Sequence, residues 1–313
     1  GAMMAKYILK RVFYMFITLF LIATATFFLM KTLPGSPISS ASKLNDTQLA
    51  AVEAKYGLDQ PIPVQYGKYM ANLVQGDLGN SYQFKGASVT DLILKRLGPS
   101  FLLGAQGLIL GISIGILLGM IAALRQNTIW DYGSTFIAIL GISIPSFVFA
   151  SFLQYWFAVK WGVLPVALWN DGWKSSILPS IALAMGPLAT GARFIRTEMI
   201  EVLSSDYITL AKSKGATGFE VAFKHAFRNA LIPLVTVMGP LAAGLLTGSL
   251  VIEKIFAIPG IGEQFVKAIM VSDFSIIMGT TLFFSVFLVL VILLVDILYG
   301  IIDPRIRLSG GNS

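Results

Sequence analysis

Side chains able to carry out covalent chemistry or to hold a metal are scarce in this sequence. Its 313 residues include no cysteine and one histidine, His225. Without cysteine there is no disulfide, thiolate metal site or cysteine nucleophile, and one histidine cannot build a multi-histidine site. His225 could act as a general base, but a packing or hydrogen-bonding role is favoured because no nucleophile motif accompanies it. We therefore predict a chain with no catalytic residue, metal site or cofactor of its own.

Nucleotide chemistry within the chain is also disfavoured. The one Gly-Lys pair, Gly67-Lys68, is followed by Tyr69, and no glycine stands five residues before it. The phosphate-binding loop of nucleotide hydrolases requires that glycine, and a serine or threonine after the lysine. We expect any ATP hydrolysis to take place in another chain.

The composition is that of a membrane protein. Hydrophobic residues make up 56% of the chain and charged residues 12%, against about 25% charged residues in soluble domains, and the mean hydropathy is +0.78. A soluble protein of this composition would expose large apolar patches and aggregate. The net charge of +7 could indicate nucleic-acid binding, but in a membrane protein it more often reflects basic cytoplasmic loops.

Six stretches without Asp, Glu, Lys or Arg are long enough to cross a bilayer as helices, which takes about 20 residues. They cover residues 12–30, 97–124, 132–159, 175–192, 229–252 and 274–295. The sequence thus predicts an all-α integral membrane protein with six transmembrane helices. Gly1-Ala2-Met3 precedes Met4 as an expression scar would, and the first run is too long for a signal peptide and lacks its cleavage site.

Six spans place both termini on one side of the membrane. That side carries 12 of the 23 lysines and arginines, and the other side carries only 4 once the long segment 31–96 is set aside. Basic residues favour the cytoplasm, whereas long loops cross largely regardless of charge. We expect a cytoplasmic N-terminus and first helix over 1–30, an external insertion over 31–96, a five-helix core over 97–302 and a cytoplasmic tail over 303–313.

The external insertion is expected to contain two short helices. Asp46-Thr47 could cap a first helix that ends at Tyr56-Gly57, because glycine commonly follows a helix end. Pro61 and Pro63 then introduce a second helix towards Val74, since proline is favoured in a first turn.

A second hydrophilic segment, residues 193–228, falls between the fourth and fifth predicted spans, on the side of the termini. One helical piece begins near Ser204, Gly215 breaks it, and Thr217 and Glu220 have the capping-box spacing that starts a second piece. Two interpretations stay open: an amphipathic helix lying on anionic lipid, or a knob that docks a cytoplasmic partner. Its positive charge concentrates at Lys212, Lys214, Lys224 and Arg228.

Glycines recur every four residues in the second span and form one stripe of the helix. Small residues let a second helix approach closely, so we favour a helix–helix seam over a pore-lining stripe. The six charge-free runs also hold no ionisable residue, which weakens the case for proton or sodium coupling. The stripe consists of Gly107, Gly111, Gly115 and Gly119.

The segment 193–228 resembles a known signature. Residues 207–215 read Tyr-Ile-Thr-Leu-Ala-Lys-Ser-Lys-Gly, and nine residues later come His-Ala-Phe-Arg-Asn-Ala and Pro233. This is similar to the signature loop of permease subunits of binding-protein-dependent ABC importers, whose general pattern is Glu-Ala-Ala, three residues, Gly, nine residues, Ile-x-Leu-Pro. Ala211 and Gly215 match that pattern. The departures at Thr209, Leu210, His225 and Arg228 are typical of the oligopeptide/dipeptide branch.

Other segments resemble the B-type permease subunit of that branch. Their order and spacing extend the resemblance from residue 6 to residue 307. They are Leu33-Pro34-Gly35-Ser36-Pro37, Tyr56-Gly57-Leu58-Asp59-Gln60-Pro61, Gly76-Asp77-Leu78-Gly79-Asn80-Ser81, Pro259-Gly260-Ile261-Gly262 and Asp303-Pro304-Arg305-Ile306-Arg307.

The resemblance implies half of a translocation pathway in a bacterial inner membrane. A C-type sister permease would form the other half, two cytoplasmic ATPase subunits would bind ATP and Mg, and an external peptide-binding protein would deliver short peptides. Nickel, heme-like or glycoside solutes are the alternative substrates, and a structural or ion-coupled membrane subunit is the alternative class. The loop would be a coupling helix seated in an ATPase groove, through Ala211, Lys212, Lys214, Gly215, Ala216, Thr217, Glu220, His225 and Arg228.

Overall fold

The computed structural model describes residues 2–33, 45–55, 57–82, 87–204, 209–210, 213–215, 227–246 and 249–302. Within these ranges the protein is helical, apart from turns and an isolated β-bridge between Asn80 and Ser88. Five helices in this part of the chain are long and apolar enough to cross a membrane, or six if one bent pair counts as a span. The all-helical membrane fold predicted from the sequence is confirmed.

The six charge-free runs fall on helices that extend beyond them. The second run lies within α4, which begins at Val89, inside the predicted insertion, and the fourth lies mainly in α7, which continues past residue 193 to Leu203. Helices therefore start earlier or end later than the charge pattern indicates. The bounds are α1 (Ala2–Thr32), α4 (Val89–Leu124), the 3-10 helix η3 (Gly172–Ser176), α7 (Ile177–Leu203), α10 (Arg228–Leu246), α11 (Leu250–Ile255) and α13 (Phe274–Ile302).

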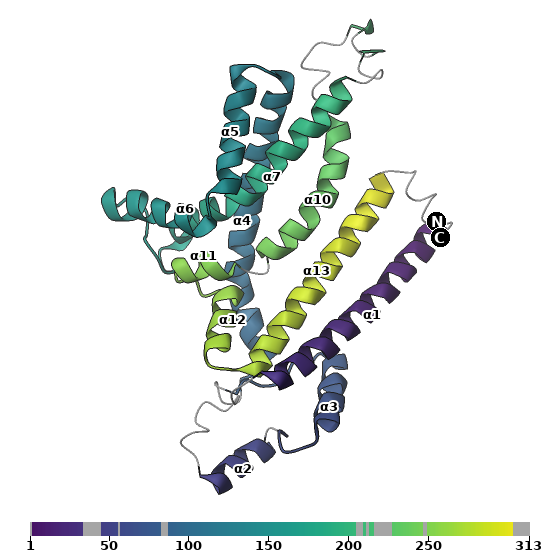
Figure 1. The fold of residues 1–313 in the computed structure, drawn as a ribbon, viewed down its shortest axis with the longest axis vertical. Coiled ribbons are helices and arrows are strands. Elements are labelled where there is room, and N and C mark those ends of the chain that lie inside the picture. The colour runs from purple at the N-terminus through teal and green to yellow at the C-terminus, as the bar shows by residue number, and fades with distance from the viewer. Residues whose placement is uncertain are drawn as a thin grey trace.

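The third run, residues 132–159, is not one straight span. It comprises α5 (Ile129–Ser143), α6 (Ser146–Leu153) and the π-helix η2 (Gln154–Lys160), and the two halves meet at an angle of 102°. The bend falls at Pro145, which has no N–H to donate and cannot continue the preceding helix. The chain therefore bends at this proline, and α6 leaves the direction of α5 (Figure 1).

Two short helices fill the insertion after α1, as predicted: α2 (Asp46–Lys55) and α3 (Ile62–Val74). The cap of α2 lies one residue earlier than predicted, because Asn45 Oδ1 accepts from the Gln48 N–H at 2.8 Å. The helix α3 is fixed to α1 by a 2.7 Å hydrogen bond between Thr24 and Tyr66 and by contact between the rings of Phe27 and Tyr66.

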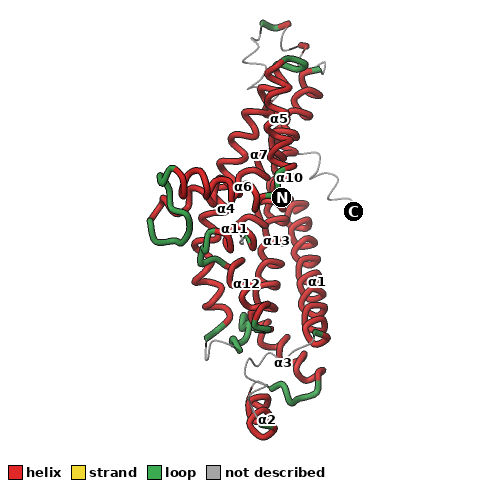
Figure 2. The backbone as a smooth tube through the Cα atoms, turned by 60° about the vertical axis from the view of Figure 1, so that its left-hand side comes forward, coloured by secondary structure: helices red, strands yellow, loops and turns green. Residues whose placement is uncertain are grey.

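The helices give the molecule two distinct ends (Figures 1 and 2). We call one the loop end, where α4 turns into α5, α7 ends and α10 begins. The opposite, insertion end carries α2, α3 and α12 (Ile261–Met270). The start of α1 and the end of α13 point towards the loop end, so the predicted grouping of both termini with the segment 193–228 agrees with the helix directions.

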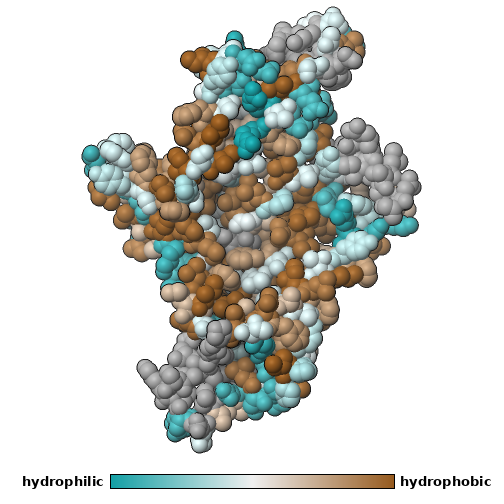
Figure 3. Space-filling model, in the orientation of Figure 1, coloured by the Kyte–Doolittle hydropathy of each residue, from teal (hydrophilic) through white to brown (hydrophobic). Residues whose placement is uncertain are grey.

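The surface matches a protein that spans lipid. Apolar side chains cover the middle of the face shown in Figure 3, and hydrophilic ones gather towards the two ends. Phe13, Phe20 and Ile109 are 62%, 53% and 66% exposed. In water such exposure would be costly, because burial of apolar area stabilises a fold by about 25 cal/mol per Å².

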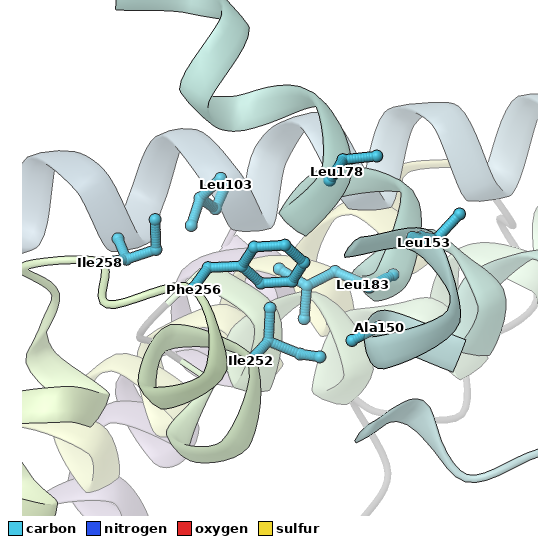
Figure 4. Close-up of a cluster of buried hydrophobic side chains, with 9 residues drawn as sticks. Leu103, Ala150, Leu153, Leu178, Leu183, Ile252, Phe256 and Ile258 are labelled. Atoms are coloured by element: carbon cyan, nitrogen blue, oxygen red, sulfur yellow. The ribbon is translucent and has the colours of Figure 1, made fainter. Parts of the chain in front are cut away.

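A buried apolar cluster joins α4, α6, α7 and α11 (Figure 4). Phe256, 1% exposed, lies at its centre, against Leu103 of α4 and Leu183 of α7. The segment that follows α10 is thereby packed onto both α4 and α7.

Candidate functional site

The glycine stripe of α4 lies buried against α7, so the two helices pack backbone to backbone. A Cβ atom placed on Gly111 would lie 2.4 Å from the carbonyl oxygen of Ala184, and one on Gly115 would lie 2.6 Å from that of Leu188. Gly107 and Gly119 are equally closed by α7. No side chain fits at these positions without moving a helix, and none of the four lines open space.

An ion pair holds the loop end of α7 to α5. The guanidinium of Arg196 donates two hydrogen bonds to Asp131, of 2.8 and 2.9 Å, and the backbone N–H of Asn127 donates a third, also of 2.9 Å. Asp131 is only 1% exposed. The Arg196 side chain is 31% exposed, so water reaches this partner but not Asp131. Removing Arg196 would leave the Asp131 charge buried without compensation, at a cost of about 3–5 kcal/mol.

The segment 193–228 begins within α7 at this ion-paired end. Of the predicted coupling residues, the structure describes Lys214, Gly215 and Arg228. Gly215 has φ of +92°, and nothing lies within 4 Å of the position of a Cβ atom. The requirement for glycine is therefore conformational, since other L-residues are strained in this region. The remaining predictions, for Ala211, Lys212, Ala216, Thr217, Glu220 and His225, lie outside the described residues.

The helix preceding Gly215 is visible only in part. The Ser213 hydroxyl donates to the carbonyl of Leu210 at 2.7 Å, and the N–H of Lys214 donates to the same carbonyl at 3.1 Å. This is the bonding of a helical turn, so a helical stretch ends at a left-handed glycine as the sequence predicts. Arg228 is exposed at the start of α10.

At the insertion end, α11 and α12 form a hairpin closed by a buried carboxylate. Glu253, 1% exposed, accepts a hydrogen bond from the Ser100 hydroxyl of α4 and another, of 3.1 Å, from the N–H of Glu263. Ser100 in turn accepts from the N–H of Ile261 at 2.9 Å. The first turn of α12 is thus capped by one carboxylate and one hydroxyl from elsewhere in the chain, which suits the positive end of its dipole.

A second set of charges ties α12 to α4. Glu263 pairs with Arg96 of α4 and, at 3.0 Å, with Lys267 one turn along α12. Burial raises the pKa of Glu263, but the hydrogen bonds from Lys267 and Arg96 outweigh it, so the pKa lies below its ordinary value. The carboxylate is therefore ionised near neutral pH.

An open cavity of about 600 Å³ lies between the insertion, the end of α1 and the start of α13. Lys31, Lys68 and Tyr69 line it. The Tyr69 hydroxyl is buried with no hydrogen-bond partner among the described residues. Burial raises its pKa, and the nearby Tyr82 raises it further.

Sequence reasoning missed Ser100, Glu253 and the Arg196–Asp131 pair. Asp131 is conspicuous only as an acid at the edge of an apolar run, and its partner is 65 residues away. Glu253 carries a stronger signal, since it immediately ends the fifth run and is followed by Pro259-Gly260-Ile261-Gly262.

The described ranges hold no group of three or more His, Cys, Asp or Glu residues that could bind a metal. Long apolar helices and a close helix seam together define a multi-pass membrane protein. The chain belongs to the family described as the binding-protein-dependent transport system inner membrane component. The model of that family matches residues 115–308, and the model of its N-terminal region matches residues 4–100.

Several curated proteins are similar over nearly the whole chain. The dipeptide transport system permease protein DppB of Lactococcus lactis is 47% identical, covering 97% of this chain and 100% of its own. DppB of Bacillus subtilis is 46% identical, covering 97% and 99%. The oligopeptide transport system permease protein OppB of Salmonella typhimurium is 42% identical, covering 97% and 100%.

A solved structure shares the fold. The crystal structure of an amino acid ABC transporter with histidines aligns with a TM-score of 0.50 over 69% of this chain and 94% of that one. At 16% identity this likeness concerns the arrangement of helices alone.

Proposed function

We propose that the chain is a membrane-spanning subunit of an ATP-driven importer and forms half of a pathway for short peptides. The observation that carries this proposal is the 42–47% identity, over 97% of the chain, to permease proteins of dipeptide and oligopeptide transport systems. The sequence has no phosphate-binding loop, so ATP and Mg are bound by partner subunits and this chain catalyses no reaction itself.

The proposed complex has four kinds of partner. A C-type sister permease completes the pathway, two ATPase subunits sit in the cytoplasm, a peptide-binding protein delivers substrate from outside, and lipid surrounds the apolar helices. Family membership supports each of these, because binding-protein-dependent transport requires a receptor and a source of energy.

The loop end is proposed to face the cytoplasm and the insertion end to face outward. Basic residues favour this orientation, since the loop end and termini carry 12 lysines and arginines. The directions of α1 and α13 support it further, because both place a terminus towards the loop end.

Residues 207–228 are proposed to receive the movement of the ATPase subunits. Along the chain, the loop lies between α7 and α10. The helix α7 packs against α4 through the glycine seam and is paired with α5 through Asp131. A force on the loop is thereby applied to a packed unit of helices. Lys214 and Arg228 would guide docking onto acidic groups of the ATPase.

Transport by the purified complex tests this function. The complex of all subunits is placed in liposomes with its binding protein outside and ATP inside, and labelled dipeptides, a nickel chelate and a glycoside are offered separately. We expect uptake of the dipeptide alone, and none when ATP or the binding protein is omitted. Uptake of the chelate or the glycoside but not of any peptide would refute the substrate assignment.

A further inference from the structure

Polar contacts hold the hairpin α11–α12 in place. These contacts are separate from those that join α7 to α4 and α5. Its first arm, α11, is packed by Phe256 into the apolar cluster with α4 and α7. Its second arm, α12, turns away after Pro259 and meets α4 through Ser100, Glu253 and the Arg96–Glu263 pair. The position of α12 relative to α4 thus depends on buried polar groups.

The surroundings of Glu253 match a carboxylate in both hydrogen bonding and shape. Both carboxylate oxygens receive hydrogen bonds, one from a hydroxyl and one from a backbone N–H. A Cβ atom on Gly260 would lie 2.1 Å from one of these oxygens, and one on Gly262 would lie 2.5 Å from the other. The two glycines therefore leave room for the carboxylate, and their spacing is explained by Glu253.

The helix α4, whose Ser100 is hydrogen-bonded to Glu253, also reaches the other end of the molecule. The 36 residues of α4 run from α12 to the turn into α5 (Figure 1), and the glycine seam keeps α4 in contact with α7 along the way. Closely packed backbones move together, because packed interfaces resist continuous deformation.

We propose that Glu253 is a positioning residue that locks α12 to α4, so that α4 and α7 carry movement from the loop end to α12 as one body. This inference rests on the proposed function for its transport readout. The lock itself is a property of this chain and can be measured without a substrate.

The first measurement is the distance between α4 and α12 in the assembled complex. Spin labels at Leu94→Cys and Met270→Cys use exposed positions, 55% and 80% exposed, in a chain with no cysteine of its own. We expect one narrow distance distribution, unchanged between nucleotide-free and ATP-bound complexes. In Glu253→Gln it should broaden, because the amide nitrogen can no longer accept the hydrogen bond of the Ser100 hydroxyl, so one of the two bonds to the carboxylate is lost or reversed. A distance that changes with nucleotide before any substitution at Glu253 would overturn the proposal.

The second measurement is the amount of peptide imported per ATP hydrolysed, a ratio that does not depend on how much protein is folded. Losing one charge-assisted hydrogen bond shifts an equilibrium by about tenfold or more. We expect Glu253→Gln to lower the ratio by about that factor, and Ser100→Ala, a milder change, to lower it less. Asp91→Asn, which alters an exposed carboxylate in the first turn of α4, is the matched control and should leave it unchanged.

The outcomes separate the two proposals. A narrow distance and a normal ratio in both Glu253→Gln and Ser100→Ala, with reduced yield only, would show a merely structural role and refute the lock. If the unsubstituted complex imports no peptide, the proposed function fails, while the distance measurement still decides whether Glu253 fixes α12.

Discussion

The seam between α4 and α7 gives the sharpest prediction for stability, through the substitution Gly111→Ala. The added Cβ would lie 2.4 Å from the oxygen of Ala184 and 2.8 Å from the Cβ of Pro187. Contacts between such atoms normally lie near 3.5 Å, so the helices must separate by about 1 Å. Overpacking costs about 1–3 kcal/mol, and the upper part of that range applies because a backbone oxygen cannot rotate away.

Thermal unfolding of the purified complex in detergent measures this effect. The matched control is Gly133→Ala, because Gly133 lies inside the helix α5 with nothing within 4 Å of the added atom and no proline after it. Alanine is favoured over glycine inside a helix by about 0.5–1 kcal/mol, so the control should keep or raise the melting temperature while Gly111→Ala lowers it. Equal melting temperatures for the two variants would refute the seam as a determinant of stability.

Three further predictions concern charge and backbone. Gly215→Val should introduce about 1–2 kcal/mol of backbone strain at φ of +92° and weaken co-purification of the ATPase subunits. Gly215→Asn should retain co-purification, because asparagine tolerates this conformation. Equal losses in the two variants would count against the backbone explanation. Asp131→Asn should destabilise the complex by about 1.5–3 kcal/mol, because hydrogen bonds to a charged group are lost while the partly exposed Arg196 stays solvated. This should appear as a lower melting temperature, and an unchanged one would mean that the pair does not stabilise the fold. The pKa of Glu263 in the folded protein lies below its ordinary 4.5, so its contribution to stability is present above pH 4.5 and is lost as the pH falls through the pKa of the folded state. The melting temperature of Glu263→Gln should therefore decline less steeply with acid than that of the unsubstituted protein, and parallel curves would contradict this.

The spans could be predicted because a charged side chain in lipid is costly, so the absence of charge marks them. The same rule does not say where a helix ends outside the lipid. Arg193 closes the fourth run, yet α7 continues past Arg196, whose guanidinium is paired with Asp131 of another helix. A contact between residues so far apart cannot be recognised from a single sequence.

The bend at Pro145 and the α11–α12 hairpin also depend on contacts that a single sequence does not reveal. Pro145 marks where the third run breaks, but the 102° angle depends on what α6 packs against. Glu253 reads as the end of an apolar run, and only the fold shows that Ser100 and the first turn of α12 surround it. The glycine stripe could be predicted, because its period of four residues places small residues along one face of α4.

The loop end is proposed to meet the ATPase subunits while the insertion end lies outside, and cross-linking tests this orientation most directly. A maleimide–benzophenone reagent is attached in the assembled complex at Ser213→Cys in the loop or at Val74→Cys at the end of α3, both exposed positions. The account predicts that Ser213→Cys cross-links to an ATPase subunit, and that in intact cells only Val74→Cys reacts with a membrane-impermeant maleimide. An ATPase cross-link from Val74→Cys, with external labelling of Ser213→Cys, would contradict it.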